Sequence, residues 1–212
     1  MMPAETMQTQ DRQVDRVAKI GGWLFRHRTW LPLPIVAVLT LVPSPRASSI
    51  AVLAGAATVA TGEAVRLWAV RHIGVISRTR SERLGPLVRS GPFGFVRNPL
   101  YVGNLLLWIG FAISAGMLWF VPIILVVLGA EYHAIVRWEE GHLEDRLGES
   151  YRTYKAEVGR WLPRSRQSSL DFARDDPERT QPFSWGETLF SERGTLIAIA
   201  FAYLLLWGKF RI

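Results

Sequence analysis

Two short clusters carry residue types that could bind a charged ligand and support group transfer. The first is Arg97-Asn98-Pro99-Leu100-Tyr101, and the second, at 137–140, reads Arg-Trp-Glu-Glu. A carboxylate can hold an ammonium group, and an arginine can hold a carboxylate through two parallel hydrogen bonds. These residue types suit a charged, water-soluble cofactor. The alternative is that they are anchoring charges at the ends of membrane helices.

Two apolar helices must bring these clusters together. Residues 100–130 form an apolar run that is too long for one membrane span, so we expect two helices with a turn near 114–116. A helix of 17–20 residues rises roughly 25–30 Å, so such a hairpin climbs to the far membrane face and returns. We therefore expect Arg97 and Arg137 to lie near Glu139 and Glu140 at one membrane face.

The apolar residues as a whole predict an all-α integral membrane bundle with about five transmembrane helices. The runs are 31–42, 50–70, 100–118, 119–130 and 196–207. A span needs about 20 apolar residues, which the second run supplies. The first and last runs need polar flanks, tilt or local thinning of the bilayer. Because the chain has no cysteine, disulfides, thiol catalysis and cysteine-ligated metals are excluded, and we expect no metal.

The net charge of +7 is distributed in a way that predicts membrane orientation. Basic residues gather before the first apolar run, between the second and third, and after the fourth, which is the positive-inside pattern. This predicts a cytoplasmic N-terminus, two hairpins that point outward and a cytoplasmic active site, in the inner membrane if the protein is bacterial. Since the basic residues flank apolar runs, we expect no nucleic-acid partner.

The chain divides into four regions on these patterns. We expect a cytoplasmic or interfacial amphipathic segment at 1–30, a membrane core at 31–163, a cytoplasmic linker at 164–193 and an additional C-terminal transmembrane helix at 194–212. Many Gly and Pro residues between 70 and 96 predict a loop there. One amphipathic helix is expected near the end of the core, because its apolar residues recur at helical intervals. They are Leu143, Leu147, Tyr151, Tyr154 and Val158.

Two ordered motifs resemble a known family. The segment 87–103 reads Leu-Val-Arg-Ser-Gly-Pro-Phe-Gly-Phe-Val-Arg-Asn-Pro-Leu-Tyr-Val-Gly. It resembles the isoprenylcysteine carboxyl methyltransferase and phospholipid methyltransferase superfamily, as do Glu139-Glu140 and the segments 148–154 and 158–163. The resemblance covers about residues 66–163. It implies a non-Rossmann, all-helical membrane methyltransferase that transfers a methyl group from S-adenosylmethionine to a lipid or lipid-modified acceptor. A phospholipid amine and a prenyl-type carboxylate both remain open as that acceptor.

The resemblance also implies roles for individual residues. Glu139 is expected to hold the amino-acid end of S-adenosylmethionine. Arg97, Arg137 and Glu140 are the catalytic candidates, because an arginine could orient a carboxylate acceptor and a carboxylate could assist proton loss from an amine. Further cofactor contacts are implied for Gly85, Pro86, Leu87, Val88, Phe93, Asn98, Pro99, Leu100 and Tyr101.

The sequence departs from the family pattern at two positions. Asn98 stands where the family usually has histidine, and Phe93 stands where it usually has tyrosine. Asparagine still donates and accepts hydrogen bonds but takes up no proton at neutral pH. If the family histidine acts as a base, His133 or His142 would have to replace it here.

Charges within the apolar runs admit two interpretations. Glu63, Arg66 and Glu131 are costly in a membrane and are functional candidates for that reason, but Glu63 and Arg66 are spaced for a structural ion pair. Two rival functions also remain, namely an NADPH-dependent membrane reductase of the steroid-reductase type and a non-catalytic scaffold. The additional C-terminal helix is expected to cover the site laterally or to form a homo-oligomer.

Overall fold

The computed structural model describes residues 17, 19–73, 87–164 and 183–211. Apart from one isolated backbone bridge between Val96 and Gly159, the regular structure in these ranges is helical. The predicted all-α membrane helical bundle is therefore confirmed. Two of the expected cofactor contacts, Gly85 and Pro86, lie outside the described residues.

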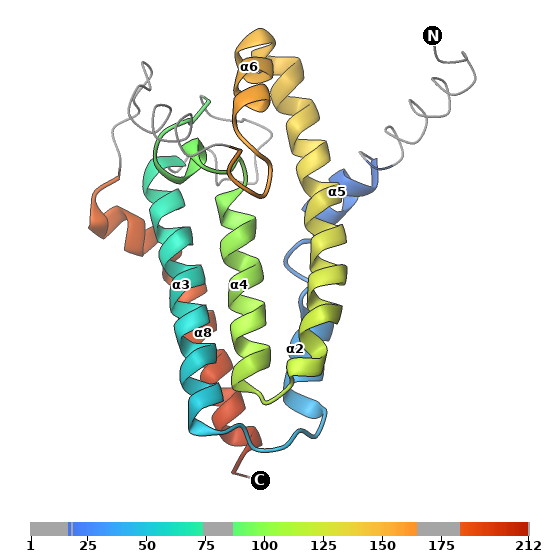
Figure 1. Cartoon of the computed structure of the whole chain (residues 1–212), viewed down its shortest axis with the longest axis vertical. Helices are drawn as coiled ribbons and strands as arrows, with labels where there is room; N and C mark the ends of the chain where they lie inside the picture. Colours follow the sequence, from blue (N-terminus) through green and yellow to red (C-terminus); the bar gives the residue numbers. More distant parts are fainter. Residues whose placement is uncertain (1–16, 18, 74–86, 165–182, 212) are drawn as a thin grey trace, which may run out of the picture.

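The helices run along the long axis of the molecule (Figure 1). Three stretches are long and apolar enough to cross a membrane, Ser49–Ile73, Leu118–Leu147 and Trp185–Lys209, whereas Pro99–Ser114 is a shorter apolar helix. Residues 19–27 are helical as well. In chain order the elements are α2 (Leu33–Leu41), α3 (Ser49–Ile73), η2 (Gly91–Gly94), α4 (Pro99–Ser114), η3 (Leu118–Phe120), α5 (Val121–Leu147), α6 (Glu149–Glu157) and α8 (Trp185–Lys209).

The C-terminal helix α8 begins earlier than the sequence pattern indicated. It starts at Trp185, within the region expected to be a linker, because Ser184 and Glu187 form a capping box. The Ser184 hydroxyl accepts from the Glu187 amide at 3.2 Å, and the Glu187 carboxylate accepts from the Ser184 amide at 2.9 Å. This cap satisfies helix-end amides and allows polar residues to form the first turns of α8.

The amphipathic helix expected after Glu139 is instead two helices. Gly148 has φ +54°, a conformation that glycine adopts more readily than other residues, and it interrupts the helix between α5 and α6. The apolar residues on either side still share one buried cluster, in which Tyr151, Tyr154 and Val158 pack against Leu143 and Leu147. The spacing therefore predicted the shared face correctly but not the break.

The packing of α3 against α4 depends on glycines at the contact. A Cβ added to Gly110 would lie 2.7 Å from the Gly55 carbonyl oxygen and 2.6 Å from a methyl group of Val59. One added to Gly62 would lie 2.8 Å from the Gly103 carbonyl oxygen. Small residues of this kind let membrane helices approach closely. The close approach holds the start of α4, and with it the first cluster, against α3.

Gly110→Ala is expected to destabilise the bundle by about 1–3 kcal/mol, because the new methyl group would press against the α3 backbone. The fraction of full-length protein that stays monodisperse in detergent after heating measures this loss. Gly129→Ala is the matched control, since a Cβ there meets no atom within 4 Å. Equal losses in both variants would contradict the role of the α3–α4 contact.

Candidate active site

The two sequence clusters meet at one end of the bundle. Asn98 stands at the N-cap position of α4 and Pro99 occupies its first turn, while the second cluster lies near the end of α5. The chain after α6 then folds back against the first cluster, and the Arg97 amide donates to the Gly159 carbonyl oxygen at 2.9 Å. We call this end, which carries α6 in Figure 1, the motif end.

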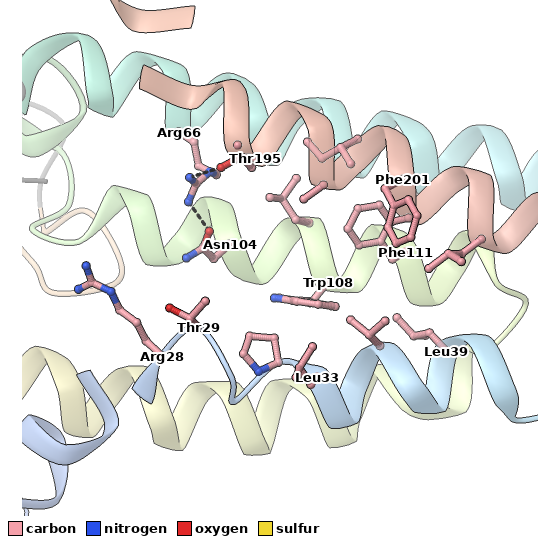
Figure 2. Close-up of a pocket in the computed structure, with 18 of the residues that line it drawn as sticks. Arg28, Thr29, Leu33, Leu39, Arg66, Asn104, Trp108, Phe111, Thr195 and Phe201 are labelled. Carbon is pink, nitrogen blue, oxygen red and sulfur yellow. Dashed lines mark hydrogen bonds between the residues drawn. The ribbon is translucent and has the colours of Figure 1, made fainter. Parts of the chain in front are cut away.

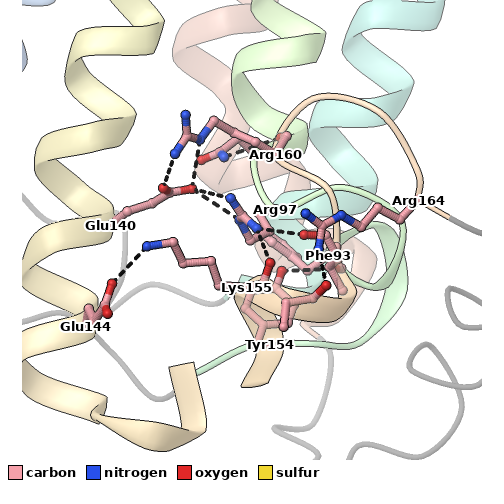
Figure 3. Close-up of polar contacts among 11 residues, drawn as sticks. Phe93, Arg97, Glu140, Glu144, Tyr154, Lys155, Arg160 and Arg164 are labelled. Atoms are coloured by element: carbon pink, nitrogen blue, oxygen red, sulfur yellow. Dashed lines mark hydrogen bonds and ion pairs between the residues drawn. The ribbon is translucent and has the colours of Figure 1, made fainter. Parts of the chain in front are cut away.

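Glu140 is held between two arginines (Figure 3). Arg97 donates to its Oε1 from Nη2 at 2.9 Å and from Nε at 3.1 Å. Arg160 donates to Oε2 at 2.5 Å and to Oε1 at 3.1 Å. Glu140 is buried, with 5% of its surface exposed. We call these three residues the Glu140 clamp.

The clamp ties three parts of the chain together. Besides Glu140, Arg97 donates from Nη1 to the carbonyl oxygens of Lys155 and Val158, each at 2.7 Å. The start of α4, the end of α5 and the segment around the end of α6 are therefore connected through one guanidinium group. Arg160 was not among the predicted site residues, although it stands within the second motif. Its part in the clamp depends on the return of the chain after α6.

Glu139 faces a different partner from its neighbour Glu140. The Tyr101 hydroxyl donates to Glu139 Oε1 at 3.1 Å. In the described part of the chain this is the one hydrogen bond that the Glu139 carboxylate receives. Arg28 lies close enough to interact electrostatically with both Tyr101 and Glu139. The pair thus offers a carboxylate that can still accept from a ligand.

The loop residues that were expected to contact the cofactor are held in place by packing. Val88 and Phe93 form a buried cluster with Ala69, and Leu100 packs against it. Leu87 instead packs against the cluster of Tyr151, Tyr154 and Val158.

A tyrosine of α6 anchors this loop further. The Tyr154 hydroxyl donates to the Phe93 carbonyl oxygen at 2.8 Å. Burial raises the pKa of Tyr154 well above its ordinary value, so the hydroxyl remains a hydrogen-bond donor. The segment 87–94 therefore presents a preorganised backbone at the motif end.

Four further candidates lie around the site without joining the clamp. Arg137 is half-buried, and among the described residues it has no hydrogen bond or ion pair. Asn98 makes a long hydrogen bond of 3.4 Å to the Arg160 carbonyl oxygen. His133 and His142 are exposed, and the His142 ring nitrogen lies 3.0 Å from the Trp138 carbonyl oxygen.

A cavity of about 610 Å³ opens among α2, α4, α5 and α8. Figure 2 shows Arg28, Thr29, Arg66, Asn104 and Thr195 gathered at one end of it. The rest is lined mainly by apolar side chains, which include Leu39, Phe111 and Phe201. Tyr101 also lines the cavity, so this residue connects it with Glu139. The sequence did not predict the cavity, because its wall combines residues from α2, α3, α4, α5 and α8.

The fold defines an all-helical integral membrane protein, and the comparison with known families makes that class more specific. Residues 50–150 match the sequence model of the phospholipid methyltransferase family. The match confirms the resemblance to this family over the first motif and Glu139-Glu140, and the family indicates a membrane methyltransferase. The matched residues include α4, α5 and all of α3 except its first residue, but neither Arg160 nor α8. Comparisons with curated proteins and with solved structures gave no significant match.

Proposed function

We propose that the protein transfers a methyl group from S-adenosylmethionine to a lipid or lipid-modified acceptor at the motif end. The observation that carries this proposal is the double contact of Tyr101, which donates to Glu139 and also lines the amphipathic cavity. A water-soluble cofactor and a membrane-embedded acceptor can react only where a polar site adjoins an apolar one. Tyr101 stands at such a junction.

The residues present fit the amino-acid end of S-adenosylmethionine. Glu139 would accept from the ammonium group while Tyr101 keeps the carboxylate in place, and charge-assisted hydrogen bonds of this kind are among the stronger ones. The segment 87–101 supports the remaining contacts through its fixed backbone. When bound, the cofactor supplies a methyl group on a positively charged sulfur, which is already activated for transfer.

The chain itself would act mainly by binding, orienting and excluding water. Aligning two reactants accounts for a large part of the rate in such reactions. A carboxylate acceptor needs no base, and half-buried Arg137 is the residue that we propose would orient it. An amine acceptor must lose a proton, and His142 is a further candidate for accepting it.

For Arg97 and Glu140 we favour a positioning role over the catalytic role that the sequence suggested. Both carboxylate oxygens of Glu140 accept from guanidinium groups, so they are poorly placed to take a proton. We also propose that the motif end is cytoplasmic, because the basic residues of the chain concentrate there.

Calorimetry on the full-length protein in detergent tests the proposal. S-adenosylmethionine and S-adenosylhomocysteine should bind, whereas NADPH should neither bind nor compete. Absence of binding by both sulfur compounds would overturn the proposal, and NADPH binding would favour the reductase. Membranes incubated with methyl-labelled cofactor should then yield a labelled lipid. Its identity decides between an amine and a carboxylate acceptor.

A further inference from the structure

The helix α8 lies outside the family-matched residues and still forms one wall of the cavity. Thr195 lines the polar part, and Ala198, Phe201 and Ala202 line the wall farther along α8. The family-matched helices therefore enclose the cavity only in part. The remaining wall comes from residues outside the match, which are those of α8, of α2 and of the segment just before α2.

A buried ion pair with α3 fixes how far α8 extends along the bundle axis and how it is rotated about its own axis. Arg66 of α3 donates to the Glu192 carboxylate at 2.7 Å and to the Thr195 hydroxyl at 2.9 Å. Glu192 is completely buried, and Arg66 also pairs with Glu63 at 3.4 Å. Breaking a buried pair of this kind is costly, so rotation of α8 about its axis is opposed.

The far end of α8 is held as well. Lys209 donates from Nζ to the Leu39 carbonyl oxygen at 2.8 Å. The Tyr203 hydroxyl lies 3.3 Å from the Ser114 hydroxyl oxygen, and its ring packs edge-on against Phe111. With both ends attached, the same face of α8 stays turned toward the cavity.

The face of α8 that lines the cavity carries three small residues. Gly194, Ala198 and Ala202 follow one another at intervals of four, so they share one side of the helix. A Cβ added to Gly194 would meet no atom within 4 Å. The width of the cavity along α8 therefore depends on the small size of these residues, and larger side chains at these positions would fill the cavity.

Buried polar groups line the polar end of the cavity. Glu131 lines it with 9% of its surface exposed, and Asn104 accepts a hydrogen bond from Arg66. The cavity volume of about 610 Å³ is within the range of about 300–1,000 Å³ usual for small-molecule sites. A pocket with a polar end and an apolar body fits one amphiphile with a polar group and a hydrocarbon chain.

We propose that α8 selects the methyl acceptor by its hydrocarbon chain, which lies along Ala198 and Ala202 while the polar group lies near Arg28 and Asn104. This inference rests on the proposed methyl transfer and adds a determinant of specificity to it. An acceptor with a chain too long or too bulky for the space beside α8 would be excluded. The same headgroup on a shorter chain would be accepted.

Ala198→Phe tests the inference in full-length protein reconstituted into vesicles of lipids with mixed chain lengths. After incubation with methyl-labelled cofactor, mass spectrometry gives the chain-length distribution of the labelled lipids. The variant should shift that distribution severalfold toward shorter chains and bind the cofactor as the wild type does. Ala200→Phe is the matched control, because both alanines are exposed on the same helix but only Ala198 lines the cavity.

Two results would overturn the inference while leaving the methyl transfer intact. One is an unchanged distribution with Ala198→Phe, and the other is a uniform loss at all chain lengths. If that variant does not fold, Ala198→Leu is measured in its place and should shift the distribution in the same direction. Absence of any labelled lipid from the wild type would instead overturn the proposed function itself.

Discussion

Glu140→Gln is expected to destabilise the motif end by about 3–5 kcal/mol, the usual cost of removing one partner from a buried ion pair. The variant would leave the guanidinium groups of Arg97 and Arg160 without the carboxylate that now accepts from both. The side chain of Arg97 is 7% exposed, so water cannot readily compensate for its charge. The connection between α4, α5 and the end of α6 should weaken as a result.

Glu144→Gln provides the matched control on the same helix. Glu144 also pairs with two cations, Arg152 at 3.1 Å and Lys155 at 2.9 Å, but the side chain of Arg152 is 61% exposed and that of Lys155 is 41% exposed. Exposed pairs contribute only about 0–1 kcal/mol. Thermal unfolding in detergent should therefore separate the two variants clearly.

The same experiment distinguishes a positioning role from a catalytic one. If Glu140 positions the site, Glu140→Gln should lower stability and weaken cofactor binding together. If it takes part in proton transfer, the variant should bind the cofactor and unfold like the wild type while turnover falls. A stable, cofactor-binding and inactive Glu140→Gln protein would contradict the clamp.

The sequence predicted the hairpin of α4 and α5 because the length of the apolar run and the rise of a helix can both be read from one continuous segment. The apolar run of 100–130 was too long for one span, and the observed α4 ends at Ser114, within the expected turn. The return of α5 then places Glu140 against Arg97, as expected from helix rise alone. The Glu63–Arg66 pair also follows from spacing, and the structure has it at 3.4 Å.

Features that depend on packing between distant segments were not predictable in the same way. The cavity is formed by residues from both ends of the chain, and no single segment carries its pattern. The spacing allowed an ion pair between Arg66 and Glu63, but nothing in the sequence indicated Glu192, which is 126 residues away. The pattern placed the start of the last helix near residue 194, because polar residues fill the first turns of the helix that the Ser184 cap begins. In each case the structure depends on a contact between residues far apart in sequence or on a hydrogen bond of one particular side chain.

The second large effect is expected at Glu139. Glu139→Gln should weaken S-adenosylmethionine binding about tenfold to a hundredfold, because a hydrogen bond to a charged group contributes about 1.5–3 kcal/mol. Tyr101→Phe keeps the carboxylate charge and loses only the hydroxyl that orients it. Its effect on cofactor binding should be smaller, about fivefold or about 1 kcal/mol, because the hydroxyl orients the carboxylate and the ammonium contact itself is kept. Calorimetry measures both.

The order of these two effects is what tests the proposed cofactor site. If Glu139 holds the ammonium group, Glu139→Gln should impair binding more than Tyr101→Phe, and both proteins should unfold near the wild-type temperature. Glu149→Gln, whose side chain is 83% exposed, should bind the cofactor normally. If Glu139 is only an anchoring charge at a helix end, its variant should bind as tightly as that control. That result would remove Glu139 from the site and move the search for the cofactor contact to Arg137 and Asn98.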